Sequence, residues 1–133
     1  MTPDQLQDLK KHIAGLVLFY KEKGYDLKPY PKIVFSNDNN PSDILDKTGF
    51  YRHGDNTVML YTNGRAPKDV LRTCAHEFIH VLQGHRGDLD DDKIGAVSDD
   101  YTKGSEHLKE MEDEAYLMGN TLMRAYTESL KKA

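Results

Sequence analysis

The sequence predicts a single α+β domain that spans residues 1–133. Apolar residues recur at helical spacing in three segments, at the two ends of the chain and after its middle. Between the first two segments lie short apolar runs of the kind that form buried strands or hairpins. No internal repeat or interior linker divides the chain, so one core is the simplest organisation for a protein of this length.

The N-terminal segment predicts a helix that begins at Pro3. Thr2 is placed to cap it, proline suits the first helical position, and Gln5 can complete a capping box with Thr2. Gly24 is a suitable stop. The apolar residues that would face the core are Leu6, Leu9, Ile13, Leu16, Val17 and Tyr20.

The next part of the chain predicts a small sheet. Residues 32–35 form a short apolar run after two prolines, which suits a buried strand, and residues 38–42 have the composition of a loop. Residues 49–53 and 57–62 flank Gly-Asp-Asn, a pattern typical of a hairpin with a three-residue turn. We expect 57–62 to be an edge strand that an extended peptide could join.

Two further helices are predicted. Pro67 suits the first position of a helix that would run to Gln83, with Gly84 at its C-terminal side. Residues 84–104 contain few apolar anchors, so we expect a long loop there. The last helix carries one continuous apolar stripe formed by Leu108, Met111, Ala115, Met118, Leu122 and Ala125.

Composition excludes several classes of protein. The net charge of -4 and the pI near 5.8 argue against a nucleic-acid partner, which usually meets a basic face. Cys74 is the single cysteine, so an intramolecular disulfide or a cysteine-rich zinc module is excluded, and we interpret Cys74 as a small core residue. The N-terminus lacks the layout of a signal peptide and no apolar run could cross a membrane, so we expect a cytoplasmic protein without a membrane partner.

The stretch CAHEFIHVLQ, residues 74–83, contains the most informative motif. His76 and His80 are four residues apart, so on a helix both imidazoles point from one face, and neutral imidazole is a favoured zinc ligand. Glu77 projects about 100 degrees away, where it can act as a general base on a zinc-bound water. The alternative is a pair of partly exposed histidines hydrogen-bonded to neighbours.

A catalytic zinc ion normally takes three protein ligands, so a third must come from elsewhere. Glu112 and Glu114 flank the apolar stripe of the last helix on opposite sides, and either could reach a metal held by a neighbouring helix. His107 and His85 compete with them. The residues alone leave this choice open. The candidates that do not bind the metal would be solvated surface residues. Alternatively, Glu114 or His107 could be the hydrogen-bond partner of a ligand histidine.

HEFIH followed by a glutamate-bearing helix resembles the gluzincin branch of the zincin metallopeptidases. The ExxA pattern at residues 112–115 resembles the ligand helix of small intracellular members that cleave repressors, and 49–83 together with 110–120 is similar to small phage-encoded proteins. The resemblance implies a minimal zincin-like fold and Glu112 as the third ligand. Gln83 and Arg86 occupy positions where the metzincin branch has glycine and histidine, so that branch is disfavoured.

These observations together predict a zinc-dependent metallopeptidase with one Zn²⁺ and a peptide or protein substrate. If a phage encodes the chain, the host cytoplasm is its expected location. Tyr101 is a candidate for stabilising the transition state, with His107 and Tyr116 as further candidates. Two alternatives remain: a catalytically silent zincin-fold binding module, and a metal-dependent ribonuclease that uses His85 as its third ligand.

Overall fold

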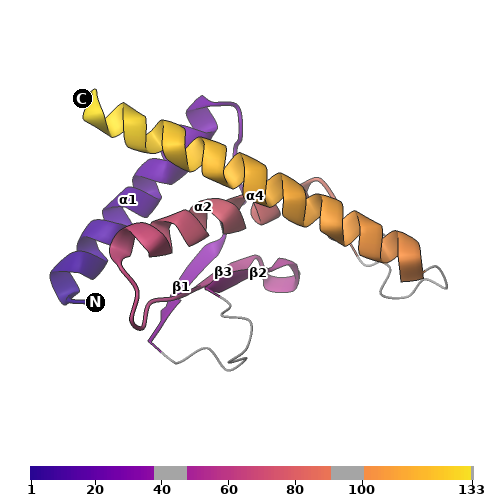
Figure 1. The fold of residues 1–133 in the computed structure, drawn as a ribbon, viewed down its shortest axis with the longest axis horizontal. Coiled ribbons are helices and arrows are strands. Elements are labelled where there is room, and N and C mark those ends of the chain that lie inside the picture. Colours follow the sequence, from indigo (N-terminus) through magenta and orange to yellow (C-terminus); the bar gives the residue numbers. More distant parts are fainter. Residues whose placement is uncertain (38–47, 91–100, 133) are drawn as a thin grey trace.

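A computed structural model describes residues 1–37, 48–90 and 101–132 of the chain. Its architecture is α+β, with a small mixed sheet and long helices (Figure 1). A single 3-10 turn, His53–Asp55, joins β2 to β3. In chain order the main elements are α1 (Pro3–Glu22), β1 (Lys32–Ser36), β2 (Gly49–Arg52), β3 (Thr57–Tyr61), α2 (Pro67–His85) and α4 (Tyr101–Lys131).

Helix α1 begins as its sequence predicts. The Thr2 hydroxyl accepts a hydrogen bond from the Gln5 backbone at 3.1 Å, and the Gln5 side chain accepts one from the Thr2 backbone at 2.9 Å. The capping box is therefore confirmed. The helix ends just before Gly24, which has a positive φ of 95° that glycine adopts without strain. Its buried face consists of Leu9, Ile13, Leu16 and Tyr20.

The sheet has the order β1-β3-β2. β2 and β3 pair antiparallel, which confirms the hairpin, and β1 pairs parallel to the other side of β3. The expectation that 57–62 is an edge strand is wrong, because β3 lies between two partners and its Val58 and Leu60 are fully buried. Among the described residues, β2 is instead an edge strand on the hairpin side.

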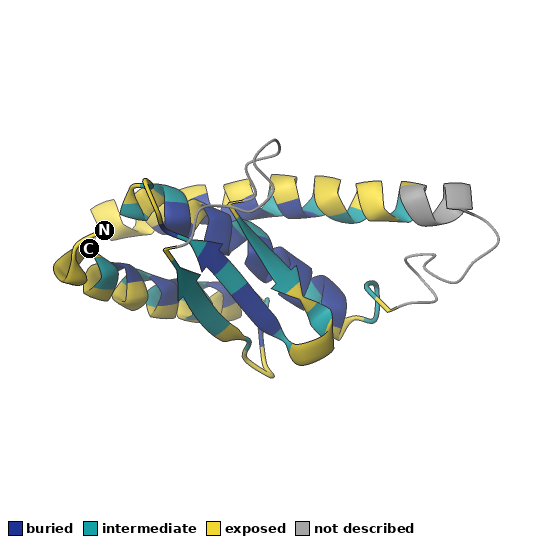
Figure 2. Ribbon diagram, turned by 90° about the horizontal axis from the view of Figure 1, so that it is seen from below, coloured by how far each residue is buried: buried dark blue, intermediate teal, exposed yellow. Residues whose placement is uncertain are grey.

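Helix α2 occupies the middle layer of the molecule. It packs against β2 and β3 on one side and against α1 and α4 on the other (Figure 1). Figure 2 shows buried residues concentrated in the central strand and in the helix behind the sheet. The Tyr20 hydroxyl of α1 donates to the Ala75 carbonyl of α2 at 2.7 Å. A helix enclosed in this way is buried almost all round, which puts the polar side chains of its second half inside the protein.

The boundaries of α2 and α4 differ from the sequence prediction. α2 continues to His85, and Gly84 is a buried helical residue whose added Cβ would lie 2.7 Å from Nδ1 of His53. The chain turns at Gly87 instead, with a φ of 86°. α4 begins at Tyr101, so the loop expected up to residue 104 ends earlier.

The predicted apolar stripe of α4 is buried at Ala115 and Leu122, whereas Leu108 is exposed. Residues 38–42 and 91–100 lie outside the described residues.

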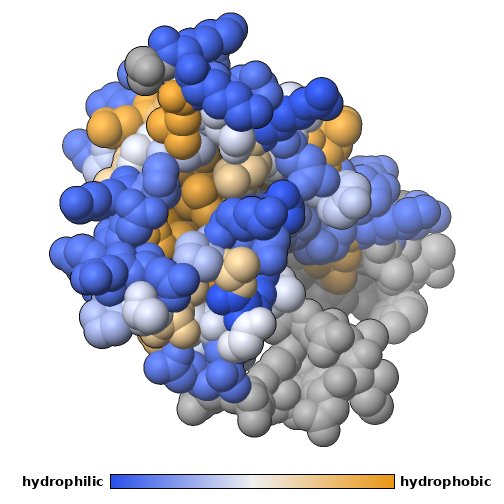
Figure 3. Space-filling model, turned by 60° about the vertical axis from the view of Figure 1, so that its left-hand side comes forward, coloured by the Kyte–Doolittle hydropathy of each residue, from blue (hydrophilic) through white to orange (hydrophobic). Residues whose placement is uncertain are grey.

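One face of the molecule is mostly polar. On the face drawn in Figure 3, hydrophilic residues predominate and hydrophobic ones appear mainly in a narrow strip between them. None of the described helices is long and apolar enough to cross a membrane. The acidic run after α2 is paired in its described part, since Asp88 contacts Arg86 and Asp90 contacts His53.

Candidate metal centre

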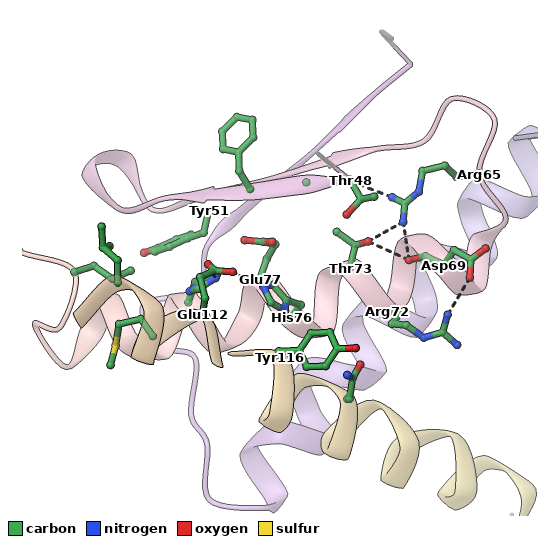
Figure 4. A pocket seen from close by; sticks show the side chains of 17 residues that line it. Thr48, Tyr51, Arg65, Asp69, Arg72, Thr73, His76, Glu77, Glu112 and Tyr116 are labelled. Atoms are coloured by element: carbon green, nitrogen blue, oxygen red, sulfur yellow. Dashed lines mark hydrogen bonds and ion pairs between the residues drawn. The ribbon is translucent and has the colours of Figure 1, made fainter. Parts of the chain in front are cut away.

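Three side chains from two helices meet at the surface between α2 and α4. Nε2 of His80 lies 2.7 Å from Oε1 of Glu112, and Nε2 of His76 lies 3.6 Å from Oε2 of the same carboxylate. The two imidazole rings stand nearly perpendicular, at 79°, with their centroids 5.0 Å apart. One potential ligand atom from each residue lies within 4.8 Å of the others, so the three residues could hold a metal ion (Figure 4). We call His76, His80 and Glu112 the metal group.

The spacing of the three ligand atoms can be compared with that around a tetrahedral zinc ion. Ligand atoms placed 2.0–2.1 Å from a tetrahedral zinc ion are separated from one another by about 3.3 Å. The two contacts of Glu112, at 2.7 and 3.6 Å, lie on either side of that value. These contacts involve different oxygens of Glu112, and the three ligand atoms lie within 4.8 Å of one another, so the side chains would have to adjust to surround an ion.

Small residues on α4 bring Glu112 to the histidines. An added Cβ at Gly119 would lie 2.9 Å from Cα of His76, so the absence of a side chain lets the two helix backbones touch there. Ala115, one turn before Gly119, is also fully buried. Glu112 lies on the same face about two turns from the contact, because helical residues three and four apart are neighbours. The closeness of the helices thus sets the position of the carboxylate.

Gln83 fixes the orientation of His80. Its amide nitrogen donates to the Met111 carbonyl at 2.8 Å and to Oε1 of Glu114 at 2.9 Å. Its amide oxygen is therefore free to accept from Nδ1 of His80 at 2.7 Å. When the imidazole is neutral with its proton on Nδ1, Nε2 is the atom left to bind a metal ion, on the side of Glu112.

Glu114 completes this network from α4 without joining the metal group. Oε1 of Glu114 accepts from Arg86 at 2.7 Å, and Arg86 also pairs with Asp88. Burial alone would raise the pKa of Glu114, but its hydrogen bonds from Gln83 and Arg86 outweigh burial and lower that pKa. The ionised carboxylate can therefore keep orienting Gln83 at neutral pH.

Glu77 is the buried acid of the site, with 6% of its surface exposed. Burial is the main reason that its pKa is raised to about 7; Glu112 acts in the same direction, while His80 and a hydrogen bond from the Tyr51 backbone oppose it. Burial also lowers the pKa of His76, with a contribution from His80, which favours the neutral imidazole that binds metals. Glu77 is thus a carboxyl group suited to exchanging protons near neutral pH.

The metal group lines a pocket of about 830 Å³. One wall of the pocket is the edge strand β2, its floor is α2, and the opposite wall is α4 (Figure 4). Among the lining residues from α4 are Leu108, Met111, Tyr116 and Asn120. Tyr116 has 69% of its surface exposed. A molecule of peptide size could therefore reach the histidine pair from solvent.

The other predicted site residues lie elsewhere. Nε2 of His107 contacts the Asp88 carbonyl at 2.8 Å, and Nε2 of His85 contacts the Leu27 and Pro29 carbonyls at 3.1 and 3.0 Å. Neither joins the histidine pair, so Glu112 alone among the candidate third ligands does so. Tyr101 begins α4, but its side chain lies outside the described part of the structure.

Sequence reasoning missed two features of the site. In the sequence Gln83 stands out only as a departure from the metzincin pattern, although a fully buried amide three residues after His80 can reach that imidazole. The strand β2 was missed as the edge strand and pocket wall because the second partner of β3 is β1, a strand distant in the sequence. Comparisons with models of known protein families, with curated proteins and with solved structures find no match to this chain.

Proposed function

We propose that this protein is a zinc-dependent metallopeptidase with a minimal zincin-like fold, in which His76, His80 and Glu112 hold one Zn²⁺. One observation carries the proposal: a buried glutamate, Glu77, stands directly after the first histidine of a three-ligand group in an open pocket. Two imidazoles and one carboxylate are a donor set typical of catalytic zinc. When bound, zinc would polarise a peptide carbonyl and lower the pKa of water from 15.7 to about 7.

Glu77 would act as the general base and then as the general acid. It takes a proton from the attacking water and delivers that proton to the amine that leaves when the peptide bond breaks. The Tyr51 backbone holds the carboxylate of Glu77 by a hydrogen bond, which fixes its direction. Gln83 accepts a hydrogen bond from Nδ1 of His80 and so holds the ring with Nε2 directed toward Glu112, where the ion would bind.

The edge strand β2 would position the substrate. It replaces β3 in this role, since β3 has partners on both sides. An extended peptide that pairs with the backbone of residues 49–51 would lie along the pocket, with its carbonyl groups beside the metal group. Backbone pairing of this kind binds peptides of varied sequence, so side-chain selectivity must come from other pocket residues.

A pair of variants tests the proposal. Glu77→Gln should retain one equivalent of zinc and lose peptide hydrolysis, whereas His80→Ala should lose both. The exposed Glu110→Gln on α4 is the matched control and should keep both. Zinc is measured by elemental analysis and hydrolysis by mass spectrometry of a digested peptide library. A Glu77→Gln protein that still cleaves peptides would contradict the role of Glu77.

The same samples separate the alternatives. A zinc-loaded wild-type protein that cleaves no peptide in the library, yet binds a specific partner, would favour a silent binding module. Cleavage of RNA without peptide hydrolysis would favour a ribonuclease. The contacts of His85 with the Leu27 and Pro29 carbonyls give no support to that histidine as a third ligand.

A further inference from the structure

The pocket extends beyond the metal group toward the start of α2. Arg72 lies one turn before His76 on the same face of the helix and lines this end of the pocket. Its side chain is 57% exposed, and its Nη1 atom contacts Oδ1 of Asp69 at 3.1 Å. In Figure 4 the guanidinium lies to the side of Tyr116, away from Glu77. The residue is thus accessible to a molecule that already occupies the site.

A second arginine lines the same end. Arg65 donates to the Thr48 and Tyr61 carbonyls at 3.1 and 2.9 Å, and also to the Asp69 carbonyl and the Thr73 hydroxyl (Figure 4). These acceptors are all uncharged. The carboxylate of Asp69 is the single acidic group among the described lining residues at this end, so two arginines and one aspartate leave a net positive charge.

The direction of β2 indicates which part of a peptide would meet this charge. An added Cβ at Gly49 would lie 2.9 Å from Cγ2 of Thr73, and one at Gly84 would lie 2.7 Å from Nδ1 of His53. β2 therefore runs in the same direction as α2. A peptide that pairs antiparallel with β2, the slightly more stable arrangement, would run the opposite way and approach Arg72 with its C-terminal part.

We infer that Arg72 forms a subsite for a carboxylate located two or three residues after the cleaved bond, with Arg65, whose Nη groups are bonded to the protein, adding positive charge beside it. The midpoint between His76 and His80 lies about 9 Å along the helix from Arg72, at 1.5 Å per residue. An extended peptide covers about 3.4 Å per residue, which gives that spacing. Guanidinium groups bind carboxylates by paired, charge-assisted hydrogen bonds. The carboxylate could belong to an acidic side chain or to the peptide's C-terminus.

This inference rests on the proposed function, and metal-anchored probes test it without turnover. We would use succinyl hydroxamates joined to a dipeptide, because the hydroxamate binds zinc and fixes the register of the attached residues. Four members suffice: a neutral Gln-Gln amide, a Glu-Gln amide, a Gln-Glu amide, and Gln-Gln with a free C-terminus. The last member distinguishes a terminal carboxylate from an acidic side chain.

Affinities are measured by calorimetry on zinc-loaded wild type, Arg72→Gln and Lys68→Gln. Lys68 is an exposed residue one turn earlier on α2 that does not line the pocket, so its substitution removes the same charge from the same helix. At least one acidic member should bind wild type fivefold or more tightly than the neutral member. The preference should fall below twofold in Arg72→Gln and persist in Lys68→Gln.

Equal binding of acidic and neutral members, or a preference that survives in Arg72→Gln, would overturn the inference even if the protein cleaves peptides. A preference that depends on Arg72 in a protein that cleaves no peptide would instead overturn the peptidase and leave the subsite standing. A protein that binds no zinc would contradict both.

Discussion

Two residues beside the metal group, Glu77 and Gln83, have opposing demands placed on them. Glu77 must be buried to exchange protons near neutral pH, and the same burial makes its negative charge unfavourable in the metal-free protein. Gln83 must be buried to orient His80, and this requires that all its hydrogen-bonding groups find partners. We therefore expect substitution of either residue to have a measurable effect.

Glu77→Gln should stabilise the metal-free protein at high pH. The folded protein holds the pKa of Glu77 at about 7, above the ordinary value of 4.5, so its contribution is fully present below pH 4.5 and is lost as pH rises through 7. The loss amounts to roughly 3 kcal/mol by pH 8. Urea unfolding of chelator-treated proteins at pH 5 and pH 8 measures it. The variant should exceed wild type at pH 8 and match it more closely at pH 5; a variant less stable than wild type at pH 8 would refute this account.

Gln83→Leu should weaken zinc binding by about 10- to 100-fold, the usual cost of removing a group that orients a ligand histidine. Leucine has a similar volume but cannot fix the tautomer of His80. Competition with a chromophoric chelator gives the affinity. Gln7→Leu, at an exposed position of α1, is the control and should bind zinc as wild type does. Unchanged zinc affinity in a folded Gln83→Leu protein would show that the orientation of His80 does not depend on the amide.

At the scale of elements, the contact between α2 and α4 builds the site. The starts of α1 and α2 could be predicted because Pro at the first helical position of both helices, and the capping box of α1, act locally. The choice between Glu112 and Glu114 could not be made from periodicity, since both flank the apolar stripe. It depends on which face of α4 meets His76, and the close approach at Gly119 determines that face.

Gly119→Ala should separate the ligands. The added Cβ would lie 2.9 Å from Cα of His76, and a helix backbone yields less easily than a side chain, so α4 would have to shift. We expect zinc affinity to fall at least fivefold despite the higher helix propensity of alanine, which is worth about 1 kcal/mol. Gly54→Ala is the control, because nothing lies within 4 Å of its Cβ position. Zinc affinity that matches the control would mean that α4 tolerates the methyl group without moving Glu112.

At the scale of the whole molecule, the order of the strands escaped prediction for a physical reason. β1 and β3 pair in parallel across a long intervening segment, and no local pattern specifies such a contact. The α+β class and the hairpin could be predicted from the sequence because turn composition and apolar runs are local signals. The pocket wall could therefore be identified only once the three strands had been placed side by side.

Zinc binding should stabilise the contact between α2 and α4. An ion held by α2 and α4 stabilises the folded state by about 2.7 kcal/mol at a free concentration one hundred times the dissociation constant. Hydrogen exchange should slow at the amides of residues 106–118 when zinc is added and change little in α1. His80→Ala should show no change in either region. Equal slowing throughout the chain would indicate global rather than local stabilisation.

The burial of Cys74 has a practical consequence. Its thiol is wholly enclosed two residues before His76, and burial raises its pKa, so a sulfhydryl reagent meets little reactive thiolate in the native protein. Since the chain has no other cysteine, alkylation at this one atom reports opening of the helix that carries both imidazoles. Cys74 is thus a native kinetic probe of helix opening, and its labelling rate can be measured without introducing another cysteine.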